Sequence, residues 1–593
     1  MVAAAGAAPA GTARHDVAGM GTVAAYGAPE RWFATASSVA VAITGRPRWD
    51  DVEARRDARE LGAAATALAR YLAKGDSFVQ ELRGAFAIAV VDRRSARALL
   101  AIDRFGIERL CYAVTSDGLA FGTSAESVAA HPSVGHELSP QGLFNYLFYH
   151  MVPAPGTVFA SVQKLLPAEV VAVSEGRVER SFHWRMRCAA AGNASEAEQA
   201  EQLRGLLRRS VERAADGGPA GAFLSGGTDS STVSGLLGEV GGRPADTFSI
   251  GFAAAGFDEI EYARITARHF ATRPHEYYVT PDDVAEAMPL IATVYDEPFG
   301  NASAVPTFNC ARLARDAGVA VMLAGDGGDE IFGGNARYAK QKLFEPYLRL
   351  PSPVRRTLEP LLLATPGAGV LPTLRKLQSY VRQARIPLPA RLEAHNLLHR
   401  TPVTDMLQPE FLAGVDPEEP IRLMQQTWDA SDGASAIDRM MHLDLRFTLA
   451  DNDLRKVRTM CEVAGIDVRF PMLDEDLVDF SATLAPEQKV RGQALRHFFK
   501  QSLRDFLPPE TIDKQKHGFG LPFGDWLARH RALQAIVNDA FASLAQRGIV
   551  RPEYLHTLLE RHAREHATYF GVMIWVLAQL ELWLRHHAGA ARS

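Results

Sequence analysis

The sequence predicts a two-domain α/β protein, with an antiparallel sheet in the first domain and a parallel sheet in the second. Short apolar runs joined by polar turns between residues 84 and 122 are typical of antiparallel hairpins. From residue 195 onward, apolar runs alternate with helical patterns, which predicts a parallel sheet covered by helices. A glycine-rich loop joins one of these runs to a helix. We place the two domains at residues 1–190 and 191–593.

Two hairpins define the antiparallel part. Residues 85–91 and 98–102 are apolar runs on either side of a polar turn. Residues 110–114 and 119–121 flank Ser116-Asp117-Gly118, which is a good turn sequence. Strands joined this closely pair with their chain neighbours, so this layer should be antiparallel.

The parallel part begins after a helix that we expect to be capped by Ser195 and Glu198. Strand-like runs at residues 245–250 and 319–323 enclose a helical pattern at residues 259–270. Ligands of such sheets bind beyond the carboxyl ends of the strands. The loops that follow Leu224, Ile250 and Leu323 should therefore meet at one site.

The central loop, residues 225–231, reads Ser-Gly-Gly-Thr-Asp-Ser-Ser and lies between an apolar run and a helical pattern at residues 232–239. Free backbone N–H groups and the helix dipole favour an anion at such a position. An ordinary strand-to-helix turn is the alternative interpretation. Asp229 argues against it, because a carboxylate beside phosphate requires a bridging cation. No Gly-Lys-Ser/Thr follows the glycines, so the loop is not a Walker A motif.

Two further stretches carry charges at turns. Residues 324–334 follow a strand and hold Asp326, Asp329 and Glu330, which repel one another unless a cation lies among them. Residues 514–520 read Lys-Gln-Lys-His-Gly-Phe-Gly, and a lysine delivered by a glycine-flanked loop can stabilise developing negative charge. Taken alone, each stretch has a simpler interpretation as an exposed surface loop.

Together these stretches resemble the asparagine synthetase family, whose pyrophosphate loop reads SGGxDSS. Residues 295–306 also resemble the DEPFADxSAIP segment of that family and should line the site. The resemblance implies a ligase that cleaves ATP between its α and β phosphates and adenylates a carboxylate. It implies a PP-loop ATP pyrophosphatase fold for the second domain and an Ntn-hydrolase-like fold for the first. In that register, the nucleotide-binding residues are Leu224, Ser225, Gly226, Gly227, Asp229, Ser230, Ile250 and Gly325.

The resemblance also implies the metal and catalytic residues. Asp229 and Asp329 would hold Mg²⁺ on the triphosphate of ATP. Asp326 takes the place of a catalytic Glu of the family, with the same charge and a shorter reach. Lys516 aligns with the catalytic lysine. The expected cofactors are therefore ATP and Mg²⁺.

The first domain resembles the glutaminase half of the family at residues 103–107, 121–126 and 152–159, but it lacks that half's chemistry. Family glutaminases begin Met-Cys-Gly and use the N-terminal cysteine as nucleophile. Residue 2 is Val here, and the nearest cysteine, Cys111, falls on a predicted strand, where a packed thiol is expected. Thr44-Gly45-Arg46-Pro47-Arg48 replaces the Asn-Gly-Glu segment that holds glutamine. We expect a degenerate glutaminase that serves as a scaffold.

The leading functional hypothesis is a specialised amidase, or a lactam or lasso-peptide-type macrolactam cyclase, as in family members that have lost the cysteine. Its substrates would be a small-molecule or peptide carboxylate and an amine or ammonia. Synthesis of asparagine from aspartate and ammonia is the alternative. A nucleotide-binding scaffold without turnover is a third hypothesis, but it needs neither Lys516 nor two metal carboxylates. A homodimer or a pathway partner protein is left open.

Composition narrows the remaining classes. The chain has 593 residues, 47% hydrophobic and 22% charged, and a net charge of −5, so we expect no nucleic-acid partner. Residues 1–13 should form a loose Ala/Gly-rich tail rather than a signal peptide. The last apolar helix, at residues 572–584, should be amphipathic and is too short to span a bilayer. Four scattered cysteines fit the cytoplasm. Residues 343–434 are helical without a readable motif, and their basic residues should form a solvated helix face: Arg375, Lys376, Arg382 and Arg385.

Overall fold

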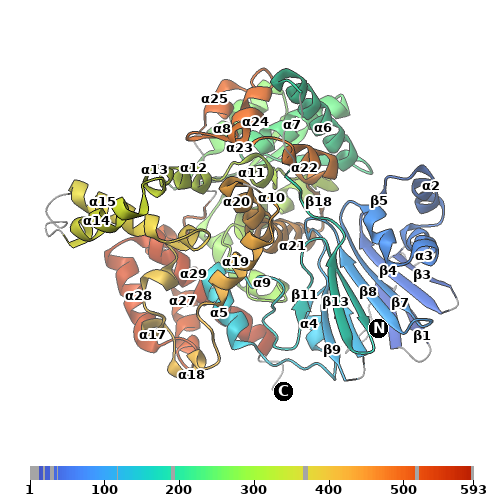
Figure 1. Cartoon of the computed structure of the whole chain (residues 1–593), viewed down its shortest axis with the longest axis horizontal. Coiled ribbons are helices and arrows are strands. Elements are labelled where there is room, and N and C mark those ends of the chain that lie inside the picture. The colour runs from blue at the N-terminus through green and yellow to red at the C-terminus, as the bar shows by residue number, and fades with distance from the viewer. Residues whose placement is uncertain are drawn as a thin grey trace.

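The computed structural model describes residues 12–17, 21–26, 32–36, 38–116, 118–188, 194–254, 256–364, 372–433, 435–514 and 520–588. Most of the predicted tail, much of the predicted linker at residues 185–195, and Lys516 lie outside these ranges. Both parts of the predicted fold class are confirmed. An antiparallel sheet is built near the N-terminus, and a separate parallel sheet follows it (Figure 1).

The antiparallel sheet has six strands in the order β13-β12-β8-β7-β4-β3. Their bounds are β3 (Phe33–Ala36), β4 (Val39–Gly45), β7 (Phe86–Asp92), β8 (Arg97–Ile102), β12 (Glu169–Ser174) and β13 (Arg177–Phe182). The first predicted hairpin is confirmed by the antiparallel pairing of β7 with β8. Sequence reasoning did not predict the other four strands, β3, β4, β12 and β13, although β4 (Val-Ala-Val-Ala-Ile-Thr-Gly) has the β-branched residues that are typical of a strand.

Both faces of this sheet are covered. The helices α2 (Val52–Glu60) and α3 (Ala63–Lys74) pack on one face, where Ile88 joins a core with Leu68. A small sheet of β9 (Cys111–Thr115), β10 (Gly118–Gly122) and β11 (Gln163–Lys164) packs on the other face. Its pairing of β9 with β10 confirms the second predicted hairpin. Every residue of β7 is consequently buried.

The parallel sheet has five strands in the order β16-β15-β14-β17-β18, and every neighbouring pair is parallel. Their bounds are β14 (Ala220–Phe223), β15 (Asp246–Phe252), β16 (Arg273–Val279), β17 (Val321–Leu323) and β18 (Asp467–Arg469). The strand order reverses at β14, which has β15 on one side and β17 on the other. Parallel sheets open a ligand crevice at such a reversal, beyond the carboxyl ends of the strands.

Helices cover the parallel sheet. They include α6 (Glu196–Ala215), α7 (Thr228–Gly241), α8 (Ile260–His269), α10 (Ala304–Asp316) and α21 (Arg455–Ala464). The predicted cap of α6 is confirmed, because Ser195 and Glu198 form a reciprocal capping box. Helix α7 begins at Thr228, four residues before the predicted start. The glycine-rich loop is therefore shorter than expected, and Asp229 lies in the first turn of the helix.

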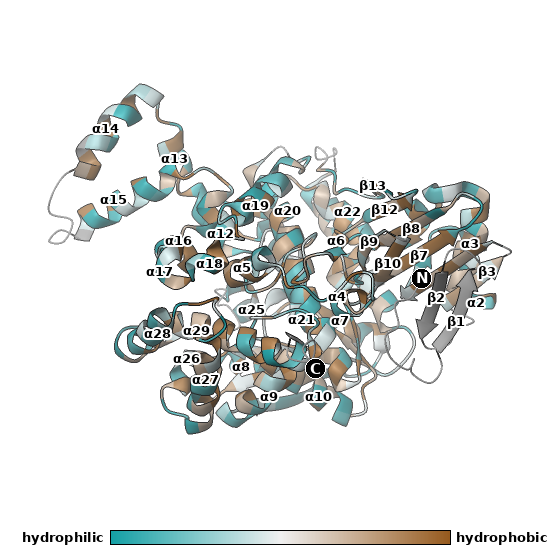
Figure 2. Ribbon diagram, turned by 90° about the horizontal axis from the view of Figure 1, so that it is seen from below, coloured by the Kyte–Doolittle hydropathy of each residue, from teal (hydrophilic) through white to brown (hydrophobic). Residues whose placement is uncertain are grey.

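Most of the other elements are helices. They include α4 (Ala125–Ala129), α5 (Pro140–Tyr149), α9 (Pro281–Val294), α11 (Gly328–Phe332), α12 (Ala336–Lys342), α16 (Leu397–Arg400), α18 (Pro409–Leu412), α19 (Glu419–Asp429), α20 (Ala436–Leu443), the π-helical η3 (Asp444–Leu454), α24 (His497–Ser502), α26 (Phe523–Leu527), α27 (Arg531–Leu544) and α28 (Pro552–Arg564). Helices α14 (Ser352–Ala364) and α15 (Pro372–Arg385) project from the body as an arm (Figures 1 and 2). The basic residues predicted to form a solvated face on α15 are exposed, as expected.

The last helix differs from its prediction. Helix α29 (Ala567–Trp583) continues into η5 (Leu584–Ala588), so the apolar helix is longer than residues 572–584 and is not amphipathic. By length and composition, Ala567–His587 could cross a membrane, and it is the one helix of the described chain that could. Most of it, 72% of the apolar window, is buried among neighbouring helices. It is apolar on every side because it is packed on every side.

Residues 295–306 are also placed differently from the prediction. Of this segment, Pro306 lines the large cavity at the parallel sheet. Asp296 and Glu297 lie where the two halves of the chain meet, because both pair with Arg109 of the first half and Arg455 of the second. Glu297 is fully buried and accepts from Lys164 at 2.8 Å and from Arg109 at 3.0 Å. The segment therefore joins the two halves of the chain more than it shapes the site.

Candidate active site

A cavity of about 850 Å³ lies beyond the carboxyl ends of β14, β15 and β17. The loops predicted to meet at one site do meet there. With the exception of Gly226, each residue predicted to bind nucleotide lines the cavity, and so do Asp326 and Asp329. The strand reversal at β14 explains the location, because the loops on either side of it diverge and leave space between them.

The glycine-rich loop forms the floor of the cavity at the N-terminus of α7. The backbone N–H of Ser225 donates to Ser230 Oγ at 3.2 Å, which folds the loop onto the first turn of the helix. Gly226 has a φ of +71°, and a Cβ there would lie 2.4 Å from the carbonyl carbon of Tyr262. Glycine is therefore required at this position by both backbone angle and space. The unpaired N–H groups at the helix start favour an anion such as pyrophosphate.

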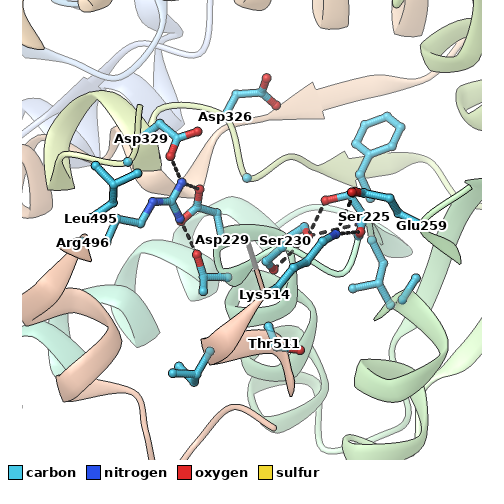
Figure 3. Close-up of a pocket in the computed structure, with 18 of the residues that line it drawn as sticks. Ser225, Asp229, Ser230, Glu259, Asp326, Asp329, Leu495, Arg496, Thr511 and Lys514 are labelled. Atoms are coloured by element: carbon cyan, nitrogen blue, oxygen red, sulfur yellow. Dashed lines mark hydrogen bonds and ion pairs between the residues drawn. The ribbon is translucent and has the colours of Figure 1, made fainter. Parts of the chain in front are cut away.

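Asp229 and Asp329 are brought together, and a cationic side chain that the sequence did not predict lies between them. Arg496 donates to the two carboxylate oxygens of Asp229 at 2.6 and 2.7 Å, and it also pairs with Asp329 (Figure 3). Asp229 comes from α7, Asp329 from α11 and Arg496 from the start of α24. Nothing in the residues around Arg496 sets it apart from other arginines, so only the fold identifies it.

The two carboxylates suit a magnesium site that is completed by the nucleotide. Within the described chain, no group of three or more His, Cys, Asp or Glu side chains could hold a metal alone. Asp229 and Asp329 nonetheless converge on one positive group, which places their oxygens around a common point. Mg²⁺ is typically held by one or two carboxylates together with phosphate oxygens and water. The donor set therefore fits Mg²⁺ bound to a triphosphate.

Asp326 lines the same cavity but stands apart from the Arg496 cluster (Figure 3). Burial raises the pKa of its carboxyl to about 6, although the positive charge of Lys456 opposes the increase. Lys456 also lines the cavity and donates to Asp453 at 2.7 Å. The sequence alone assigns no role to this lysine.

One end of the stretch at residues 514–520 closes over the glycine-rich loop. Lys514 forms an ion pair with Glu259 at 2.9 Å and donates to the carbonyl oxygen of Ser225 at 3.3 Å. Its ammonium group also lies 4.5 Å from the ring centre of Tyr262. Lys514 therefore ties this stretch to the nucleotide loop. Lys516, the predicted catalytic lysine, lies outside the described residues.

Comparison with known families agrees with this geometry. The family model for asparagine synthase matches residues 202–585, and that for the glutamine amidotransferase domain matches residues 55–184. The chain belongs to the asparagine synthetase family. The amidotransferase match begins at residue 55, which is earlier than the quoted motifs indicated.

Curated relatives cover most of the chain. Asparagine synthetase [glutamine-hydrolyzing] 1 of Bacillus subtilis is 24% identical over 87% of this chain and 79% of its own length. A putative asparagine synthetase [glutamine-hydrolyzing] of Mycobacterium bovis is 26% identical over 87% of this chain and 78% of its own length. Amidase chry2 of Gibberella zeae is 23% identical over 80% of this chain and 75% of its own length.

Family membership fixes the general reaction. The protein is an ATP-dependent carbon–nitrogen ligase of the asparagine synthetase type. Its substrates are ATP, a carboxylate, and ammonia or a glutamine-derived amine.

Proposed function

We propose that this ligase adenylates a carboxylate and transfers it to an amine or to ammonia without hydrolysing glutamine. A specialised amidase or a lactam or macrolactam cyclase is the leading version. The observation that carries the proposal is the absence of a reactive thiol. Burial raises the pKa of Cys111 to about 12, and the pKa values of Cys188, Cys310 and Cys461 are also raised by burial. A thiolate nucleophile requires a lowered pKa and access to solvent.

The segment in the place of the family's glutamine clamp supports the same proposal. Arg46 donates to Asp467 at 2.8 Å, and Arg48 donates to Glu475 at 2.6 Å. Both arginines thus pair with carboxylates of the synthetase half. They do not replace the Asn and Glu side chains with which the family segment holds glutamine. We therefore treat residues 1–190 as a glutaminase-like scaffold for a synthetase domain at residues 191–593.

In the first half-reaction, the glycine-rich loop would bind the phosphates of ATP through its N–H groups. Asp229 and Asp329 would hold Mg²⁺, which neutralises phosphate charge when bound. The substrate carboxylate attacks the α-phosphorus, and the bond from that phosphorus to the bridging oxygen breaks and releases pyrophosphate. Arg496 lies beside both carboxylates and can pair with a phosphate oxygen as the nucleotide enters.

In the second half-reaction, the amine nitrogen bonds to the acyl carbon, the bond from that carbon to AMP breaks, and the amine loses a proton to solvent. Negative charge builds on the acyl oxygen in this step. We propose Lys516 as the cation that stabilises it, with Lys514 anchoring the base of the same stretch on Ser225. We place the enzyme in the cytoplasm, where its four free cysteines stay reduced.

Asparagine synthesis from aspartate and ammonia is the second candidate, because named asparagine synthetases align with most of the chain. The amidase relative favours the specialised version instead. The two differ in the carboxylate that is adenylated. Aspartate is therefore the first compound to test.

The experiment is release of pyrophosphate from ATP over a panel of carboxylates, with ammonia, amines or glutamine as the nitrogen source. We expect turnover with ammonia or an amine, and no glutamate from glutamine above background. Asp229→Asn is the matched inactive control for contaminating synthetase. Glutamate release that persists through purification and disappears in Cys111→Ala would overturn the proposal.

A further inference from the structure

A second cavity, of about 360 Å³, lies beside the nucleotide cavity and is used by no step above. Its walls come from the end of α5 and from α12, the 3-10 turn η2 (Ala390–Glu393), α16, α19, α20, η3 and α29. The two cavities share two walls. In α12, Ala336 lines the first cavity and Arg337 the second. In the helical stretch of η3 and α21, Lys456 lines the first cavity and Asn452, four residues earlier, lines the second. The second cavity is therefore an immediate neighbour of the site of adenylation.

The lining of this cavity is mainly aromatic and apolar. Tyr149 stacks on Phe447 with ring centres 5.2 Å apart, and Phe148 meets Tyr149 edge-on at 4.8 Å. Met424 and Met573 also line the space. Its volume is within the usual range for sites that take small organic molecules. Such walls favour a ligand with an aromatic or branched apolar body.

The polar groups of the cavity are mostly neutral or already paired. Arg337 forms an ion pair with Asp444, which is completely buried, and also donates to Thr448 at 3.4 Å. Burial lowers the pKa of His150 to about 4, so this imidazole is neutral near pH 7. Burial also lowers the pKa of His395, with further lowering by Lys340 and Arg400.

Glu393 is the exception. Its Oε2 accepts from the amide of Asn396 at 3.2 Å, and no basic side chain in the described part of the chain forms an ion pair with it. The cavity thus combines one carboxylate lacking a positive partner with aromatic rings. Both features favour a cation, because ring faces and carboxylates each attract positive charge.

We propose that this second cavity binds the acceptor amine, as a primary amine with an aromatic or branched apolar body whose ammonium group pairs with Glu393. The proposal rests on the proposed function, since it supplies the nucleophile for the acyl-adenylate formed next door. It also gives a reason for an apolar cavity that ammonia would not need.

Binding can be tested without ATP or turnover. Isothermal titration calorimetry with the full chain would compare 2-phenylethylamine with 2-phenylethanol and 3-phenylpropionate, which have similar bodies and different charges. We expect the amine to bind at least about tenfold more tightly than either, because a charged hydrogen bond is at stake. Equal binding of the three probes, tighter binding of the carboxylate, or no binding of any probe would overturn the proposal.

Two variants locate the effect. Glu393→Gln should abolish the preference for the amine, whereas Glu410→Gln, on the exposed face of α18, should retain it. Val572→Trp narrows the cavity from its half-exposed rim and should weaken all probes, while Val354→Trp on the distant arm should not. Retention of the preference in Glu393→Gln would overturn the assignment of this carboxylate.

Turnover then separates this proposal from the proposed function. Carboxylate-dependent exchange of pyrophosphate into ATP reports adenylation, and Glu393→Gln should leave it within about twofold because the acceptor is not involved. With an apolar amine as acceptor, the KM of this variant should rise by about tenfold or more, and with ammonia it should not. If wild type shows no exchange, the proposed function fails, and the calorimetry still decides the cavity.

Discussion

Asp229, Asp329 and Arg496 form a compact group with one more negative than positive charge. An excess negative charge at a phosphate site makes chemical sense only when a divalent cation arrives with the nucleotide, since phosphate alone would be repelled. Arg496 holds the two carboxylates near each other before that cation is present. We therefore propose that these residues bind Mg²⁺-ATP rather than free ATP.

The first prediction follows from this charge count. Asp229→Asn and Asp329→Asn should each raise the Mg²⁺ concentration needed for half-maximal pyrophosphate release. Each should also lower turnover, through a loss of ~2–4 kcal/mol of transition-state stabilisation, because one of two metal ligands is lost. Circular dichroism checks that the fold is retained. Near wild-type turnover by both variants at low Mg²⁺ would contradict the metal assignment.

Lys516 supports a second prediction that stays open. Lys516→Met should reduce turnover by roughly 10²–10³ while nucleotide affinity changes only a few-fold, because the charge it stabilises exists only during reaction. Lys514→Met is the matched comparison, since Lys514 contacts Ser225 in the nucleotide loop and should change nucleotide affinity. If Lys516→Met loses ATP binding as well, the residue holds nucleotide instead.

A third prediction concerns pH. With a carboxyl pKa of about 6, Asp326 is half-protonated at that pH in the free enzyme, so kcat/KM for ATP should fall as pH drops through 6 if the ionised form is active. The charge of Lys456 holds this pKa down. Lys456→Met should therefore move the acid limb to higher pH. Lys514→Met is the control variant and should leave the acid limb of the pH profile in place. If the limb also stays in place in Lys456→Met, it does not report the Asp326 carboxyl.

Sequence reasoning found the residues of the site that lie in recognisable loops, and it missed those that reach the site from elsewhere. Asp229 and Asp329 each follow a strand in a glycine-rich turn, so local chemistry marked them. Arg496 is 267 residues from Asp229 and has no such surroundings. Lys456 lies on a helix where a lysine is ordinary. Their roles depend on tertiary contacts, which no local pattern encodes.

At the scale of elements, the turn between β14 and α7 has little freedom. Gly226 cannot accept a side chain, because its Cβ would overlap the backbone of α8 at Tyr262 and Ala263. Gly242, which ends α7, has a similar φ of +60°, but no atom lies within 4 Å of the position that its Cβ would take. A side chain at Gly242 would strain only the backbone angle, whereas a side chain at Gly226 would also collide with a neighbouring helix. Comparing the two positions therefore isolates the effect of the collision.

This contrast gives the fourth prediction. Gly226→Ala should shift the nucleotide loop and reduce pyrophosphate release by roughly 10²-fold, the usual cost of a misplaced binding group. Gly242→Ala should cost about 1 kcal/mol of stability and leave turnover nearly unchanged. Urea unfolding and steady-state kinetics on both variants measure the two effects. Equal turnover in the two variants would mean that the loop tolerates the shift.

Strands and helices could be predicted from the sequence where one local pattern clearly marks them. The hairpins of the antiparallel sheet have turn sequences, and the strands of the parallel sheet alternate with helices. The early start of α7 was missed because Thr-Asp-Ser-Ser is typical of turns and caps as well as first helical turns. The prediction of a short amphipathic last helix is wrong, because α29 packs on all sides and is therefore apolar on all sides.

At the scale of the whole molecule, a buried cluster of charges joins the two halves of the chain. The carboxylate of Glu297 accepts hydrogen bonds from Arg109 and Lys164 of the antiparallel half. It also accepts from Arg455 of the synthetase half, at 3.3 Å. Burial alone would raise the pKa of Asp296, but the guanidinium groups of Arg109 and Arg455 hold it well below its usual value. The antiparallel half is thus fixed to the synthetase half by charge, whether or not it hydrolyses glutamine.

The fifth prediction tests this joint. Arg455 is almost fully buried and pairs with both Asp296 and Glu297, so Arg455→Met leaves two carboxylates with less positive charge inside the protein. Breaking a buried pair in this way costs about 3–5 kcal/mol, which should appear as a lower urea midpoint or as separate unfolding of the two halves. Arg422→Met removes an exposed arginine that pairs with Asp416 at 2.7 Å, and its cost should stay below about 1 kcal/mol. If the two variants unfold at the same urea concentration, the buried cluster does not hold the halves together, and their apolar contact must do so instead.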